Sequence, residues 1–163
     1  YDFFFLPTTP DIETLVFKNT RATLAGFEAS GEHDLTCHLT PFFNMSYVDG
    51  RDQDRDAPLP SIFPFQTRVG IRWHDPENKL FGIEFAARIV ANQDRIASDL
   101  FEEPTPGFTI YDLRAWWQVN PHLRLTTGID NLSDKNYLEH LSVHDPRVLE
   151  PGIIFYAALE LDY

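Results

Sequence analysis

Apolar and polar positions alternate along several stretches of this chain, which is the period expected of β-strands with two unlike faces. In the clearest stretches one face carries no charge over a length that could cross a bilayer, while the other face is polar. Five stretches meet this test, namely residues 65–73, 81–91, 109–118, 123–130 and 153–163. Three earlier stretches alternate less regularly, residues 1–5, 15–30 and 35–48, so the sequence predicts about eight strands.

The connections between these stretches alternate between short and long. Short links rich in turn-forming residues are expected at 30–34, 74–79 and 120–122, and long links at 6–13, 49–64, 93–107 and 132–152. Outer-membrane barrels have short periplasmic turns and long extracellular loops. The pattern therefore predicts an all-β fold, an antiparallel up-and-down segment of a transmembrane β-barrel, with its C-terminus in the periplasm.

Aromatic residues support this orientation, because membrane barrels carry belts of Trp and Tyr at the two interfaces. Trp73, Trp117 and Tyr163 all lie on uncharged faces at the predicted periplasmic ends of strands. We expect them to form a periplasmic aromatic girdle. Trp116 has the opposite parity and is expected to face the interior.

The polar faces carry charges of both signs that recur at spacings of two and four. We expect these residues to line the barrel lumen, where neighbouring strands can pair them: Arg68, Arg72, Glu84, Arg88, Asp112, Arg114, Arg124, Asp130, Glu160 and Asp162. A hydrated polar lumen without a specific partner explains the same pattern.

Composition narrows the classes of function. With 43% hydrophobic and 14% aromatic residues among 163, the chain is not a disordered protein, and a formal charge of −12 argues against a nucleic-acid surface. The single cysteine, Cys37, excludes an intramolecular disulfide and is expected to be a small apolar strand residue. No nucleophile elbow, zinc-protease motif or phosphate loop occurs, so we expect no enzyme and no cofactor.

Several longer motifs carry a family resemblance. They are TPGFTIYDLRAWW at 105–117, GIDNLSDKNYLEHL at 128–141 and EPGIIFYAALELDY at 150–163, with NTRATLAGFEASG at 19–31 and YVDGRD at 47–52 upstream. In order and spacing they resemble the C-terminal end of TonB-dependent receptors, including a Gly-x-x-Asn-Leu-x-Asp-x-x-Tyr motif and a closing Pro-Gly strand with a terminal aromatic residue. Ile153 stands where that family often has Arg, a departure that leaves the topology unaffected.

The resemblance implies a 22-stranded barrel in the outer membrane of a Gram-negative-type bacterium, closed around an N-terminal plug. Residues 1–163 would then be the C-terminal portion of the barrel, with the plug and the earlier strands lying outside this sequence. The implied partners are the plug, which the lumen charges would hold, the TonB complex acting through the plug, and membrane lipid and lipopolysaccharide. Terminal Tyr163 resembles the signal read by the barrel assembly machinery. The implied function is import of a scarce nutrient such as an iron-siderophore, another metal complex or cobalamin.

Candidate ligand-contact residues gather in the last long link, where the family contacts its cargo. They are Glu139, His140, His144, Asp145 and Arg147. His and carboxylate side chains suit zinc or copper, although loop spacing alone fixes no geometry, so the sequence leaves a metal role open. The acidic run at 49–56 does not fit an EF-hand, because Ala57 and Phe63 occupy the positions that need Gly and Glu.

Two alternatives remain open on the sequence. A complete eight-stranded barrel with a structural or adhesive role would pair its first and last strands. A soluble ligand-binding β-domain would instead point Ile153, Phe155, Leu159 and Leu161 into its core.

Overall fold

The computed structural model describes residues 2–9, 12–77, 79–142 and 148–162. Its regular elements are nearly all antiparallel strands. They are β1 (Asp2–Thr9), β2 (Ile12–Lys18), β3 (Ala22–Glu32), β4 (Leu39–Asp52), β5 (Ala57–Pro58), β6 (Gln66–His74), β7 (Phe81–Val90), η1 (Ser98–Leu100), β8 (Phe108–Asn120), β9 (Leu123–Asp130) and β10 (Ile154–Leu161). Within the described residues, no helix has the length and apolar character needed to cross a membrane.

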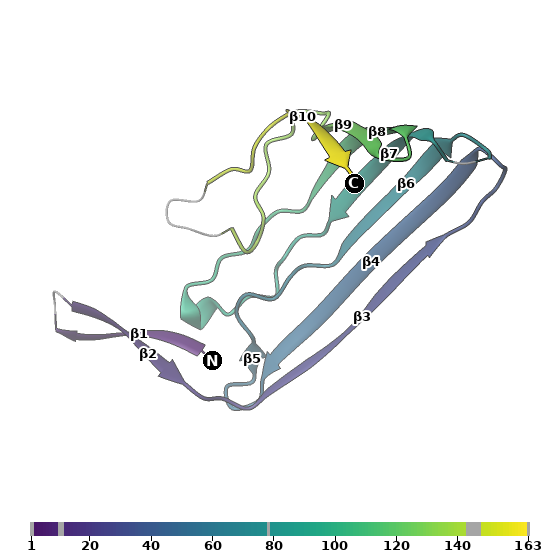
Figure 1. Cartoon of the computed structure of the whole chain (residues 1–163). Helices are drawn as coiled ribbons and strands as arrows, with labels where there is room; N and C mark the ends of the chain where they lie inside the picture. Colours follow the sequence, from purple (N-terminus) through teal and green to yellow (C-terminus); the bar gives the residue numbers. More distant parts are fainter. Residues whose placement is uncertain (1, 10–11, 78, 143–147, 163) are drawn as a thin grey trace.

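One large sheet forms most of the molecule (Figure 1). Its strands follow the order β10-β9-β8-β7-β6-β4-β3, and the short β5 pairs with β4, which makes eight strands in all. Each long strand pairs antiparallel with its neighbours in sequence, so the predicted up-and-down topology is confirmed. Among the described residues β3 and β10 do not pair with each other, so the sheet is open and the closed eight-stranded barrel is not formed.

The first part of the chain differs from the prediction. Strands β1 and β2 pair with each other in a separate two-stranded sheet, in place of a strand at 1–5 and a long loop at 6–13. The predicted strand at 15–30 is divided at residues 19–21, where Thr20 and Arg21 bond to Asp52 and Asp54 instead of continuing the ladder.

A smaller difference concerns the predicted strand at 35–48. Strand β4 begins only at Leu39 and continues to Asp52, because Leu35 and Thr36 turn back onto Leu39 through backbone hydrogen bonds. Cys37 therefore lies exposed in a turn, and its assignment as an apolar strand residue is wrong.

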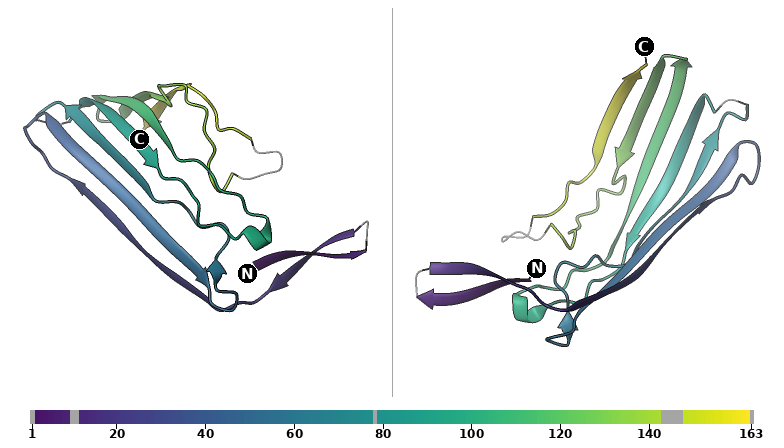
Figure 2. Two further views of the ribbon diagram at one scale, coloured as in Figure 1. Left: turned by 180° about the vertical axis from the view of Figure 1, so that it is seen from behind. Right: turned by 60° about the horizontal axis from the view of Figure 1, so that its bottom comes forward.

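The two ends of the sheet are unlike, as the alternation of links predicts. Short turns lie at one end, with described residues 33–38, 75–77, 79–80 and 121–122. The described parts of the long links, residues 53–65, 91–107, 131–142 and 148–153, gather at the other end, together with β1 and β2 (Figures 1 and 2).

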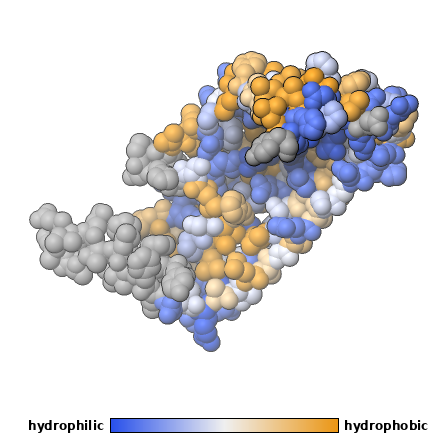
Figure 3. All heavy atoms as spheres, viewed as in Figure 1, coloured by the Kyte–Doolittle hydropathy of each residue, from blue (hydrophilic) through white to orange (hydrophobic). Residues whose placement is uncertain are grey.

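The two faces of the sheet are also unlike. We call the face that carries Ile83 and Phe85 the outer face and the face that carries Glu84 and Ala86 the inner face. Ile83 and Phe85 are 47% and 42% exposed, whereas Glu84 and Ala86 are 6% and 0% exposed. Figure 3 shows hydrophobic side chains gathered over β9 and β10 at the top of the view. The uncharged face thus points away from the molecule.

This arrangement contradicts the soluble-domain alternative. A soluble sheet buries its apolar face, but Ile153, Phe155, Leu159 and Leu161 are 40%, 69%, 70% and 69% exposed. An apolar exterior with a polar interior is the arrangement of a membrane barrel.

Candidate functional site

Antiparallel pairing assembles the inner face into cross-strand rows. Residues that pair directly across a sheet point to the same face. Arg72, Glu84, Arg114, Gly128 and Tyr156 are successive partners across β6 to β10 and form one such row. The row places three of the predicted lumen charges, Arg72, Glu84 and Arg114, on neighbouring strands.

Glu84 is the centre of an ion-pair cluster on this face. Arg68 Nη2 and Arg72 Nη2 each donate to its carboxylate at 3.0 Å. Asp112 lies 4.0 Å from Arg68, and Glu32 accepts from Arg72 at 3.3 Å. Charge-assisted bonds of this kind are stronger than neutral ones, and here the arginines are only partly exposed to solvent.

Aromatic rings cover glycines beside these charges. A Cβ built on Gly70 would lie 2.5 Å from the Phe42 ring, and one on Gly128 would lie 2.4 Å from Tyr156 Oη. Phe42 is in turn flanked by Arg68 and Arg72, whose guanidinium carbons lie 5.4 and 5.1 Å from the ring centre. The glycines therefore leave room for rings that the arginines then hold in place.

Two further ring contacts belong to the same face. Tyr156 Oη accepts a hydrogen bond from Arg114 Nε at 2.9 Å. Trp116 lies over Gly82 and donates to the carbonyl of Lys79 at 3.3 Å, so its predicted inward parity agrees with the structure.

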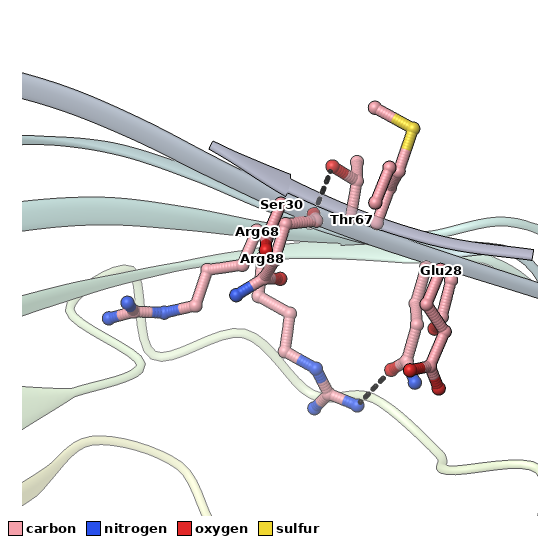
Figure 4. A pocket seen from close by; sticks show the side chains of 10 residues that line it. Glu28, Ser30, Thr67, Arg68 and Arg88 are labelled. Atoms are coloured by element: carbon pink, nitrogen blue, oxygen red, sulfur yellow. Dashed lines mark hydrogen bonds between the residues drawn. The ribbon is translucent and has the colours of Figure 1, made fainter. Parts of the chain in front are cut away.

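A cavity of about 590 Å³ lies against strands β3, β4, β6 and β7. Figure 4 shows Glu28, Arg68 and Arg88 projecting from one side of the sheet and Thr67 from the other. Arg88 Nη2 also donates to Gln66 Oε1 at 3.4 Å. The polar side chains that line the inner side are those of Glu28, Ser30, Asn44, Ser46, Gln66, Arg68 and Arg88.

The other predicted lumen residues lie nearer the C-terminal edge. Arg124 and Glu160 are direct cross-strand partners and so share the inner face. Asp130 contributes to the electrostatic environment of Arg114. Arg88 differs from the other predicted lumen residues, because it forms an ion pair with Glu139 in the last long loop.

The base of that loop is built by the residues of the Gly-x-x-Asn-Leu-x-Asp-x-x-Tyr motif. Asn131 is 2% exposed and adopts φ 51°, a conformation that Asn tolerates better than most residues. Its side chain donates to the carbonyls of Lys135 and Pro151, at 2.9 and 3.3 Å. Asn131 thus joins the two ends of the loop.

Two further motif residues complete the base. Asp134 Oδ1 accepts a hydrogen bond from the Ile153 N–H at 3.0 Å. A Cβ built on Gly152 would lie only 2.3 Å from this oxygen, so glycine leaves room for the carboxylate. Tyr137 packs its ring against Phe108, with centroids 4.3 Å apart. Burial and the nearby Glu139 carboxylate raise the pKa of the Tyr137 hydroxyl.

His140 is buried at the junction of three loops. It is 4% exposed, with Nδ1 3.0 Å from Thr105 Oγ1 and Nε2 3.0 Å from Glu102 Oε1. Glu102 also accepts the N–H groups of Ser61 and Ala97, at 2.8 and 2.7 Å. The Glu102 carboxylate therefore ties the loops at 53–65, 91–107 and 131–153 together.

This environment bears on the candidate metal role of the loop. Both ring nitrogens of His140 have protein partners, and Glu139 is engaged by Arg88. In the part of the chain that the structure describes, no group of three or more His, Cys, Asp or Glu could hold a metal ion. His144, Asp145 and Arg147 lie outside the described residues.

Of the three predicted girdle residues, two can be placed. Trp73 and Trp117 are 45% and 53% exposed and both contact Phe81, Trp73 by ring packing at 5.9 Å and Trp117 as its strand partner. They lie at the short-turn end of the outer face. Tyr163 lies outside the described residues.

The acidic run at 49–56 forms hydrogen-bonded structure at the long-loop end. Asp52 is 1% exposed, and its Oδ1 accepts bonds from Thr20 Oγ1 and the N–H of Asp54, at 2.7 and 2.8 Å. The Thr20 bond is the main cause that lowers the pKa of Asp52. Backbone and side-chain bonds from Arg21 lower the pKa of Asp54 in the same way.

Sequence reasoning missed Glu102 and Asp52 as loop-organising carboxylates. Alternation identifies neither residue, because their partners Ser61 and Thr20 are 41 and 32 residues away in sequence. The position of Asp52 at the end of the YVDGRD motif is the one local signal that could have pointed to it.

The open sheet with an apolar outer face and a charged inner face is that of a transmembrane β-barrel protein. A family model described as "TonB dependent receptor-like, beta-barrel" matches residues 2–132. The match covers more than half of the chain, and the chain belongs to this family.

Solved structures show the same fold. The copper transporter OprC matches with a TM-score of 0.86 and 24% identity, over 99% of this chain and 26% of that one. The FrpB iron transporter from Neisseria meningitidis matches with a TM-score of 0.68 and 17% identity, over 86% and 23%. The ferripyoverdine receptor of the outer membrane of Pseudomonas aeruginosa matches with a TM-score of 0.61 and 16% identity, over 96% and 22%. The chain thus spans about a quarter of the length of the proteins it matches.

Proposed function

We propose that the chain is the C-terminal part of an outer-membrane receptor that imports a scarce nutrient with energy supplied through TonB. Residues 1–163 provide closing strands and outer loops, while an N-terminal plug and earlier strands belong to the rest of the protein. The protein resides in the outer membrane of a Gram-negative-type bacterium and is not an enzyme. The names of the matched structures, which are those of transporters and receptors, support this assignment.

The observation that carries the proposal is the unlike character of the two faces of an open sheet. The outer face presents uncharged residues such as Phe85 and Leu159 to the surroundings, as lipid requires. Both edge strands, β3 and β10, have an unpaired side among the described residues. Unpaired strand edges are not tolerated in a bilayer, so further strands must complete the barrel.

The charged inner face is the proposed contact surface of the plug. Arg68, Arg72, Glu84 and Asp112 hold one another by ion pairs, which fixes a mixed-charge surface that a complementary polar domain can meet. The cavity beside Arg68 and Arg88 gives this surface a recess. Arg114, Arg124, Asp130 and Glu160 extend it toward the edge at β10.

The last long loop is the proposed ligand-contact segment. Arg88 pairs with Glu139, and Glu102 pairs with His140. We therefore assign Glu139 and His140 to holding the loop over the inner face. His144, Asp145 and Arg147 are the residues that we assign to ligand contact. The favoured cargo is a metal complex, such as an iron-siderophore or a copper species, with cobalamin as a second candidate.

Membrane and assembly partners follow from the same orientation. Trp73, Trp117 and Tyr163 form a girdle at the periplasmic interface, and the outer loops meet lipopolysaccharide. We assign Tyr163 to recognition by the barrel assembly machinery, and TonB acts through the plug.

The first test is the reading frame upstream of Tyr1. We expect several hundred codons that encode more alternating strands, a plug and a signal peptide. A start codon and signal peptide within a few tens of codons would contradict the receptor proposal.

The second test is uptake by the complete receptor. It is expressed in a Gram-negative host that lacks its own receptors, with and without TonB, and cellular iron, copper and cobalamin are measured after supply of each cargo. We expect TonB-dependent accumulation of one cargo, reduced when His144 and Asp145 are replaced by Ala. Accumulation that does not depend on TonB for any cargo would overturn the proposal.

A further inference from the structure

The three long loops meet at one carboxylate, that of Glu102. We number them outer loops 1, 2 and 3, with described residues 53–65, 91–107, and 131–142 with 148–153. The N–H of Ser61 in loop 1 donates to Glu102 Oε1 at 2.8 Å, and the N–H of Ala97 in loop 2 donates to Oε2 at 2.7 Å. Nε2 of His140 in loop 3 lies 3.0 Å from Oε1. Glu102 belongs to loop 2, so both neighbouring loops are bonded to the middle one.

The hydrogens of this junction fit together with a neutral histidine. Backbone N–H groups can only donate, so Glu102 accepts from Ser61 and Ala97. His140 then has its hydrogen on Nε2 and donates it to Glu102, while Nδ1 accepts from the hydroxyl of Thr105, 3.0 Å away. The side chain of His140 is 1% exposed and that of Glu102 is 12% exposed. Loss of any one contact would therefore leave a largely buried polar group without its partner.

The backbone is strained on two sides of the junction. Ser61 and Phe101 have φ angles of 59° and 61°, a region that residues other than glycine and asparagine rarely occupy. Ser61 supplies one of the N–H donors, and Phe101 directly precedes Glu102. Phe101 is 80% exposed, so packing of its ring does not account for this conformation. Strained residues persist where surrounding contacts enforce them, and here the bonds to Glu102 are those contacts.

Loops 2 and 3 are also fixed to the sheet at separate points. In loop 2, Arg95 donates from Nη2 to the Val48 carbonyl of β4 at 3.2 Å. In loop 3, Glu139 forms an ion pair with Arg88 of β7. The sheet therefore holds each loop near its base, whereas Glu102 joins the loops to one another.

We propose that Glu102 is the positioning residue of the ligand-contact loop and that it joins the three outer loops into one preorganised unit. The inference deepens the proposed import function and rests on it for the role of loop 3. His140 precedes His144 and Asp145 by four and five residues, so fixing His140 limits where these side chains can reach. A ligand then meets a surface that is already formed, and less of its binding energy is lost to ordering the loops.

The first test is backbone hydrogen exchange of the complete receptor in detergent, followed by mass spectrometry, in His140→Leu. Leucine fills much of the buried volume but cannot donate to Glu102. We expect protection to fall about tenfold in loops 1 and 2 as well as in loop 3, the effect of losing one hydrogen bond to a charged group. Loss of protection confined to loop 3 would overturn the proposal. Unchanged protection of β6 to β8 shows that the barrel remains folded.

Three further variants keep the test decisive. His140→Gln retains an N–H donor for Glu102 and should keep loops 1 and 2 protected, so a loss equal to that of His140→Leu would refute the bond as the link. Where leucine unfolds the barrel, Glu102→Gln replaces it, because the amide turns an N–H donor toward the Ala97 N–H and should lower protection in all three loops. Asp99→Asn is the control in loop 2. It weakens an ion pair with Arg55 at 3.6 Å and should leave loop 3 unchanged.

Uptake separates positioning from general stability. With the iron-siderophore, copper or cobalamin that the complete receptor accumulates, His140→Leu should raise the half-saturating concentration about tenfold and leave the maximal rate unchanged. A lower maximal rate at an unchanged half-saturating concentration would contradict a positioning role. If no cargo accumulates in a TonB-dependent manner, the proposed function fails, whereas the exchange experiment still decides whether Glu102 joins the loops.

Discussion

The two faces of the sheet are built from the same strands but are held by different forces. On the outer face, residues such as Phe85 and Tyr111 stack their rings 5.8 Å apart and leave their surfaces to lipid. On the inner face, Glu84 gathers two arginines, and glycines make room for rings. On the outer face a side chain needs only to be uncharged, whereas on the inner face it must fit particular partners. The effect of a substitution on stability should therefore depend on charge at the outer face and on the fit to neighbouring side chains at the inner face.

The largest effect is expected from one charge placed on either face. Ala157 and Ala158 are adjacent on β10; the partner of Ala157 on β9 is the outward Thr127, and that of Ala158 is the inward Thr126. Ala157→Arg should destabilise the complete receptor by about 2–4 kcal/mol, as charges do on the lipid face near the bilayer midplane. Ala158→Arg is the matched control and should cost less than about 1 kcal/mol. Denaturant unfolding in lipid vesicles measures both, and equal losses would contradict the assignment of faces.

The next effect concerns the centre of the inner cluster. Glu84→Gln keeps the size of the side chain but removes the charge that faces Arg68 and Arg72. We expect a loss of about 1–3 kcal/mol, because two partly buried guanidinium groups lose their shared acceptor. Glu160→Gln makes the same change at an exposed position on the same face and should cost less than about 0.5 kcal/mol. Similar losses in the two variants, measured by the same unfolding experiment, would show that burial of Glu84 has no special effect.

A smaller effect should follow when a ring loses its glycine. Gly128 does not have a positive φ, so alanine is compatible with its backbone, but the new methyl group would meet Tyr156. Gly128→Ala should cost about 1 kcal/mol by displacing the ring and its bond with Arg114. In a Tyr156→Ala background the same substitution should be nearly neutral. A cost that persists there would mean that the ring is not the reason for the glycine.

How far the sequence predicted this architecture also differs between the faces. Alternation was enough to assign Ile83, Phe85 and Leu159 outward and Glu84 inward, because strand parity is a local property. Contact with particular partners is not local. The pairing of Arg68 with Glu84 depends on the register of β6 and β7. The burial of His140 depends on three loops that are far apart in sequence but meet in space.

The N-terminal hairpin shows a second limit of the same reasoning. Residues 1–5 and 15–30 alternate in a way that suits a strand, but alternation does not say which sheet a strand joins. Thr20 and Arg21 end the ladder because they bond to Asp52 at the end of β4 and to Asp54 in the turn that follows. These partners are 32 and 33 residues away, where the local pattern cannot identify them. The same is true of Cys37, whose turn is set by backbone bonds from Leu35 and Thr36 to Leu39.

The smallest expected effect distinguishes two adjacent tryptophans. Trp117 is 53% exposed on the outer face, whereas Trp116 lies over Gly82 on the inner face. If the outer face meets lipid at this level, brominated lipids should quench the fluorescence of Trp117 but not that of Trp116. Trp117→Phe should remove a quenchable component of the receptor's emission, and Trp116→Phe should remove only an unquenched one. Trp117→Phe should change stability by no more than about 1 kcal/mol, because Phe keeps an apolar ring at the interface. If Trp116→Phe instead removed a quenchable component, Trp116 would lie against lipid. That result would contradict the assignment of the inner and outer faces of β8.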